Sequence, residues 1–145
     1  MSRQKNTDSL PRVVVLNHNP VPVVERLLSR FPDLPLTACD SYDATTEAVA
    51  RERPEVVLAF KVGTRGTFPR EAVLAADSVK WIQASGAGID HWAPWDPDKV
   101  TLTNASGIHG DVMSQYVVWA ILNHHFRFPQ LARQQAAREW NKRLL

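Results

Sequence analysis

Cysteine is almost absent from this sequence, which holds one, Cys39, in 145 residues. A single thiol excludes an internal disulfide and a zinc site built on several cysteines, and it fits a reducing compartment. Because Leu36 and Ala38 beside it are apolar, Cys39 is expected to pack in a core rather than to act as a nucleophile.

Long hydrophobic runs are absent as well. No uninterrupted apolar stretch approaches the roughly 18 residues that a membrane-spanning helix needs. The first few residues are followed by polar residues and not by the apolar stretch of a signal peptide. The sequence therefore predicts a cytoplasmic protein that does not associate with membranes.

A strong excess of one charge is missing too, since 17 basic residues face 15 acidic ones and the formal net charge is +2. Such a balance does not indicate a nucleic-acid partner. The basic residues are nevertheless unevenly spread, because residues 123–145 contain five of them and a single acid. This segment is interpreted as a solvated basic helix face, and no nucleic-acid binding is expected.

Apolar, β-branched runs alternate with segments whose apolar residues recur at helical spacing. The expected strands are residues 12–17, 34–39, 55–60, 79–84 and 100–104. The expected helices are residues 20–31, 43–53 and 69–76. This alternation indicates βαβ units and a parallel sheet covered on both faces. Right-handed crossovers then favour a small, doubly wound, flavodoxin-like α/β fold of about five strands.

The last expected helix, residues 111–126, is apolar around nearly its whole circumference at roughly 100° per residue. A helix that is apolar all round is buried all round, so another subunit or another domain is expected to cover it. Pro129 is expected to break this helix before a basic helical piece that continues to about Trp140. The expected organisation is a flexible head at residues 1–10, a flavodoxin-like domain at 11–110 and a helical tail at 111–145.

A glycine-containing turn, Ser85-Gly86-Ala87-Gly88-Ile89-Asp90-His91, follows the fourth expected strand. It is not a dinucleotide fingerprint, because His91 stands where GxGxxG has its third glycine and Pro94 breaks the short helix that follows. Ligands of open α/β sheets bind at the carboxyl ends of strands. One interpretation is therefore an anion site formed by the N–H groups of Ala87 and Gly88, and the other is a plain tight turn.

Lys61 and His109 follow the third and fifth expected strands, so both are candidates for the same sheet edge. Each is either a contact to an anionic ligand or an exposed loop residue. Asp90 and His91 make a weak acid–base pair, because adjacent residues of a helix do not face each other.

Two other site types are excluded by the residues present. A phosphoacceptor receiver needs an acidic pair after the first strand and an aspartate after the third, where this chain has Asn17, His18 and Lys61. No metal site is expected, since His124 and His125 have no third ligand at metal-binding spacing.

Three stretches carry a resemblance to a known family. They are VKWIQASGAGIDHW at residues 79–92, VTLTNASGIHGDVMSQYVVWAIL at residues 100–122, and the helical run to Trp140. Together they resemble the N-terminal, substrate-binding domain of the D-isomer-specific 2-hydroxyacid dehydrogenases, in the glyoxylate/hydroxypyruvate reductase-like branch. The resemblance covers the second half of the chain well and the first half only as a fold pattern. Gln115 departs from it, because many relatives carry Glu there.

The resemblance implies a two-domain oxidoreductase that interconverts small 2-oxo acids and D-2-hydroxy acids with NAD or NADP. It implies that the N–H groups of Ala87 and Gly88 hold the substrate carboxylate, and that Lys61, Gly86 and His109 line the same cleft. The family's nucleotide-binding domain and its catalytic residues would follow this chain. No catalytic residue and no bound cofactor are therefore expected here, and the chain alone is expected to be inactive, since hydride transfer needs the nicotinamide and a general acid.

The resemblance and the apolar helix also predict binding partners. The helical tail is expected to lead toward the absent nucleotide-binding domain, and residues 111–128 are expected to form a homo-oligomer. The alternative is a stand-alone, self-associating flavodoxin-like module with a binding or regulatory role.

Overall fold

The computed structural model describes residues 10–61 and 66–141. Almost all of the expected flexible head, residues 1–10, lies outside the described residues. The chain divides into two compact units, residues 1–106 and 107–145, so the division falls a few residues before the expected boundary at residue 110. The two units are considered separately below.

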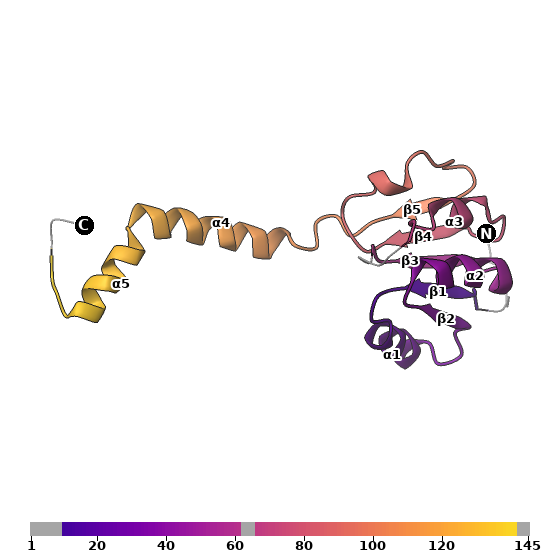
Figure 1. The fold of residues 1–145 in the computed structure, drawn as a ribbon, viewed down its shortest axis with the longest axis horizontal. Coiled ribbons are helices and arrows are strands. Elements are labelled where there is room, and N and C mark those ends of the chain that lie inside the picture. The colour runs from indigo at the N-terminus through magenta and orange to yellow at the C-terminus, as the bar shows by residue number, and fades with distance from the viewer. Residues whose placement is uncertain (1–9, 62–65, 142–145) are drawn as a thin grey trace, which may run out of the picture. The chain divides into compact units, whose positions relative to one another are not determined.

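The first unit is built on one parallel five-stranded sheet (Figure 1). Its strands are β1 (Val13–Leu16), β2 (Leu36–Cys39), β3 (Val56–Ala59), β4 (Trp81–Ala84) and β5 (Thr101–Thr103). They lie in the order β2-β1-β3-β4-β5, which confirms the expected flavodoxin-like fold.

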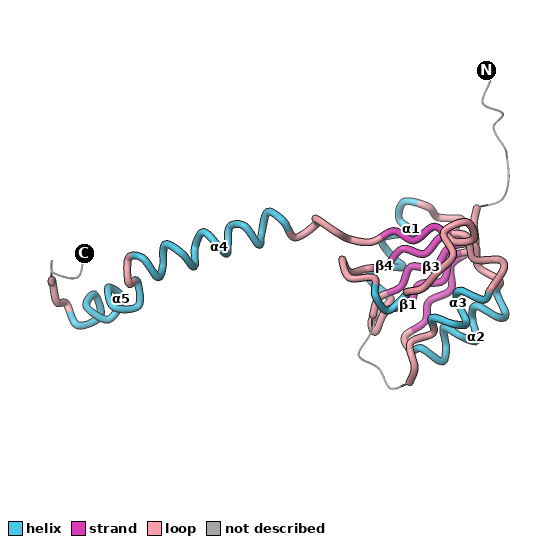
Figure 2. Tube along the Cα trace, turned by 90° about the horizontal axis from the view of Figure 1, so that it is seen from above, coloured by secondary structure: helices cyan, strands magenta, loops and turns pink. Residues whose placement is uncertain are grey.

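Helices occupy both faces of this sheet, unequally (Figures 1 and 2). They are α1 (Val21–Arg30), α2 (Tyr42–Glu52), α3 (Arg70–Ala75) and the short 3-10 helix η1 (Asp90–Trp92). α2 and α3 cover one face and bury the main core, in which Val57, Val73 and Ile82 have no exposed surface. α1 lies on the other face and contacts β2. The core thus fixes the strands whose carboxyl ends form the site.

The expectation that helices cover both faces was wrong for β4 and β5. On the α1 side, Trp81 of β4 is 43% exposed and both Thr101 and Thr103 of β5 are exposed. Trp81 Nε1 donates a hydrogen bond to Thr103 Oγ1 at 2.7 Å, and Thr103 Oγ1 donates to Gln83 Oε1 at 2.6 Å. The connection between these strands does not cover this side, because Trp92 of η1 packs into the core on the side of α2 and α3. The described residues of the first unit therefore place no helix over this part of the sheet.

The second unit consists of α4 (Gly110–His125) and α5 (Phe128–Ala137). None of the residues of α4 is buried, although apolar side chains surround it, and Val112, Tyr116 and Ile121 are each more than 60% exposed. The helix break was expected at Pro129, but the structure puts it at Arg127, which has a left-handed φ of 50°. Pro129 instead lies in the first turn of α5, where its missing N–H leaves no helical hydrogen bond unmade.

No helix in the described parts of the chain combines the length and the apolar character needed to cross a membrane.

Candidate functional site

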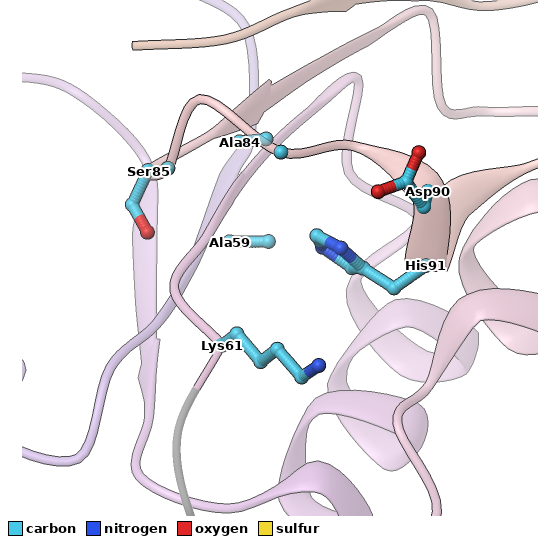
Figure 3. Close-up of a pocket in the computed structure, with 8 residues that line it drawn as sticks. Ala59, Lys61, Ala84, Ser85, Asp90 and His91 are labelled. Carbon is cyan, nitrogen blue, oxygen red and sulfur yellow. The ribbon is translucent and has the colours of Figure 1, made fainter. Parts of the chain in front are cut away.

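A cavity of about 460 Å³ opens at the carboxyl ends of β3 and β4 (Figure 3). β3 contributes Ala59 and the following Lys61, β4 contributes Ala84, and the turn after β4 contributes the rest. The lining residues are Ala59, Lys61, Ala84, Ser85, Gly86, Gly88, Asp90 and His91. In an open parallel sheet this edge is where ligands bind, so the position of the cavity favours a binding site.

Hydrogen bonds to two neighbouring strands and the segments after them hold the turn. Ser85 N–H donates to Ala59 O at 3.0 Å on the β3 side. On the β5 side, Ala105 N–H donates to Gly86 O at 3.2 Å and Asn104 Nδ2 donates to Ala87 O at 2.8 Å. The N–H groups of Ala87 and Gly88 donate to no other group among the described residues. The turn therefore offers two backbone donors to a ligand.

The two glycines of the turn are not required by its own conformation. Neither Gly86 nor Gly88 has a φ in the left-handed region, and a Cβ on either would meet nothing within 4 Å. Gly107 differs, because its φ of 88° favours glycine. The turn therefore has open space beside both glycines and could carry a Cβ at either position.

Two side chains reach into the cavity from opposite sides, Lys61 from the end of β3 and His91 from η1 (Figure 3). The His91 ring packs edge-on against Phe68, with the ring centres 4.9 Å apart. Burial lowers the pKa of His91 below its ordinary value of 6.5, the Lys61 charge lowers it further, and Asp90 opposes both. Neutral imidazole both donates and accepts hydrogen bonds, so His91 offers the cavity a polar group without a charge at neutral pH.

Arg70 at the start of α3 secures η1, which carries Asp90 and His91. Its Nε donates to Trp92 O at 3.0 Å, and its Nη2 donates to Pro94 O. Trp92 is fully buried against Phe68, with the ring centres 4.8 Å apart. The position of His91 thus depends on contacts from another helix.

The sequence-predicted residues are distributed as follows. Lys61, Gly86 and Gly88 line the one cavity. Ala87 belongs to the same turn but is not a lining residue. His109 precedes α4 in the second unit and makes no side-chain cap there.

The predicted site residues did not include the polar residues Ser85, Asp90 and His91 that line the cavity, or Asn104, which holds the turn. Asp90 and His91 were set aside as adjacent residues that do not face each other, yet both line the cavity because η1 is a single short turn at its rim. Asn104 was not singled out. Its signal was a side-chain amide directly after β5, a residue type that commonly bonds to nearby backbone.

The described residues do not fit a metal or a dinucleotide. No group of three or more His, Cys, Asp or Glu side chains among them could hold a metal ion. The turn after β4 lacks a third glycine, and the helix that follows it has three residues, too few to present an N-terminus to a pyrophosphate.

No family model matches the sequence, and no curated protein matches it by sequence. Solved structures similar to the chain include a D-lactate dehydrogenase from Treponema pallidum, with a TM-score of 0.64 and 16% identity over 92% of this chain. The chain spans 42% of the length of that protein. The signal receiver domain of a Luxo repressor protein from Vibrio parahaemolyticus matches with a TM-score of 0.51 and 10% identity, over 86% of this chain and 98% of the domain. These likenesses show a shared fold, one that occurs in both dehydrogenase and receiver proteins.

Proposed function

We propose that the first unit is the substrate-binding domain of an NAD(P)-dependent oxidoreductase that interconverts 2-oxo acids and D-2-hydroxy acids. The observation that carries the proposal is the pair of unpartnered N–H groups, Ala87 and Gly88, in the turn that borders the cavity. Adjacent backbone donors and a nearby ammonium group, Lys61, suit a carboxylate. The similarity in fold to a D-lactate dehydrogenase is consistent with this substrate class.

In this proposal the chain binds and orients the substrate. The turn holds the carboxylate, Lys61 adds positive charge, and neutral His91 contacts a polar group of the same ligand. The described residues do not fit a dinucleotide, so hydride transfer and its general acid are assigned to a separate nucleotide-binding domain. We further propose a cytoplasmic location, and we propose that residues 111–128 form the contact with that domain or with a second copy of the chain.

Titration of the purified chain tests the substrate site. We expect weak binding of glyoxylate, followed by calorimetry and by tryptophan fluorescence, and no binding of NADH or NADPH. Gly88→Pro should abolish glyoxylate binding because proline has no N–H to donate. Gly88→Ala is the matched control, since its Cβ meets open space and its N–H remains. Tight binding of either nucleotide, or glyoxylate binding that survives Gly88→Pro, would contradict the proposal.

The second candidate is a stand-alone binding module, favoured by the match to a complete receiver domain. This chain lacks the acidic residues of a phosphoacceptor site. A receiver carries acids after its first and third strands, whereas here Asn17 and His18 follow β1 and Lys61 follows β3. A binding module would keep the carboxylate site without a nucleotide-binding partner. Co-purification of the chain with a second, nucleotide-binding polypeptide, or a reading frame that continues into one, separates the two candidates.

A further inference from the structure

The carbonyl groups of the turn after β4 face the segment after β5. Gly86 O accepts from Ala105 N–H at 3.2 Å, and Ala87 O accepts from Asn104 Nδ2 at 2.8 Å. The first bond comes from the backbone, and the second comes from a side chain. Only the hydrogen bond to Ala87 O therefore requires a particular side chain outside the turn, that of Asn104.

These bonds determine where the neighbouring N–H groups point. A trans peptide is planar, so its N–H is directed opposite to its C=O. Ala93-Pro94 is the cis bond of the described chain, and both peptides of the turn are trans. The N–H groups of Ala87 and Gly88 consequently point away from Asn104 and Ala105, in the same general direction. Gly88 itself lines the cavity.

The Ala87–Gly88 peptide has an alternative orientation that the chain permits. Rotating this peptide by about 180° changes φ at residue 88 toward positive values, which glycine adopts freely. In that orientation the Ala87 carbonyl would replace the Gly88 N–H at the cavity and would repel a carboxylate. The hydrogen bond from Asn104 opposes this flip.

The Asn104 amide is itself fixed. Its Oδ1 accepts from Ser106 N–H at 3.1 Å, which leaves Nδ2 to donate to Ala87 O. Asn104 is exposed, so its side chain contributes little to the core. This exposure separates its effect on the turn from an effect on folding.

We propose that Asn104 is a positioning residue, whose amide holds the Ala87–Gly88 peptide so that the Gly88 N–H faces the carboxylate of the ligand. The inference rests on the proposed carboxylate site and assigns its geometry to a residue that does not touch the ligand. Asn104 acts here through the Ala87 carbonyl.

Nuclear magnetic resonance on the full chain, with glyoxylate as the probe, tests this. Asn104→Leu removes both side-chain hydrogen bonds without adding charge, and Asn104→Asp keeps the acceptor for Ser106 but loses the donor. We expect roughly tenfold weaker glyoxylate binding in each, the scale of one hydrogen bond to a charged group, and a changed Ala87 carbonyl resonance in the free protein. Thr101→Ala, at an exposed position of β5, the strand that precedes Asn104, should leave both unchanged.

A double substitution separates positioning from a general structural role. Alanine at residue 88 disfavours the positive φ of the flipped peptide, and its Cβ meets nothing within 4 Å. Asn104→Leu should therefore weaken glyoxylate binding much less in a Gly88→Ala background than in the wild-type chain.

The results distinguish a failure of the positioning role from a failure of the carboxylate site. Equal losses in the two backgrounds, or unchanged affinity in both Asn104 variants, would overturn the positioning role and leave the carboxylate site standing. Failure of the wild-type chain to bind glyoxylate would overturn the site and this inference together. The free-protein Ala87 resonance keeps the test decisive if one variant folds poorly, because the other variant still reports the hydrogen bond.

Discussion

His91 combines half-burial with a position between opposite charges, Lys61 and Asp90. Burial and Lys61 hold its pKa below 6.5, so the unfolded chain binds a proton at this residue more readily than the folded one does. The stability that neutral His91 contributes is complete above about pH 6.5 and is lost as the pH falls through the folded-state pKa. Acidification should therefore destabilise the wild-type chain more than His91→Asn.

Denaturation at several pH values between 7 and 5 measures this difference, and resonance titration measures the pKa directly. Lys61→Met should raise the pKa of His91, because it removes the neighbouring positive charge, and Asp90→Asn should lower it. Identical pH dependence of the wild-type chain and His91→Asn would show that His91 is protonated equally in both states.

At the level of single residues, the sequence predicted backbone features better than side-chain surroundings. Cys39 is buried as expected, and burial raises the pKa of its thiol, with the Thr45 hydrogen bond opposing this rise. The glycine turn also lies at the expected sheet edge. The roles of Asn104 and His91 were not predicted, because they depend on contacts with residues that are distant in sequence.

At the scale of elements, α3 holds η1 in place beside the cavity through Arg70. Arg70→Leu removes two hydrogen bonds to the carbonyls of Trp92 and Pro94, and we expect a loss of about 1–2 kcal/mol in the free energy of unfolding. Glyoxylate binding should weaken as well, because η1 carries Asp90 and His91. Urea denaturation and calorimetry measure the two effects.

The control for this substitution is Arg51→Leu. Arg51 pairs with its neighbour Glu52 on the exposed side of α2, and such surface pairs contribute little. Its replacement should leave stability and binding nearly unchanged. If Arg70→Leu behaved in the same way as Arg51→Leu, the anchoring of η1 through Arg70 would be refuted.

Element types followed from apolar periodicity, and the strand arrangement followed only from the fold class inferred from their alternation, whereas coverage of the sheet did not follow from either. In β5 the pattern Thr101-Leu102-Thr103 alternates polar and apolar residues, which is typical of a strand with one buried face. This alternation indicated that one face of β5 is exposed. In the structure, Leu102 packs against the core while both threonines are exposed. Pro129 was misread for a local reason: proline is tolerated in the first turn of a helix and does not only break one.

At the scale of the whole molecule, the main feature is α4, none of whose residues is buried. Apolar side chains surround it, and contiguous exposed apolar surface of this kind indicates an interaction site. The sequence predicted this helix and its all-round apolar character. The sequence of one chain does not encode in any local pattern what covers such a surface.

Sedimentation velocity over a range of concentrations tests whether a second copy is that partner. We expect the full chain to self-associate, with Val118 and Ile121, now 55% and 61% exposed, becoming buried. Burying a side chain of this size contributes about 2 kcal/mol, so Ile121→Glu should weaken association by more than tenfold. Gln115→Glu is the matched control, since it adds the same charge to α4 at a position that already carries a polar side chain. A folded wild-type monomer at high concentration would refute self-association, and equal weakening by both substitutions would assign the effect to charge and not to burial of the apolar surface.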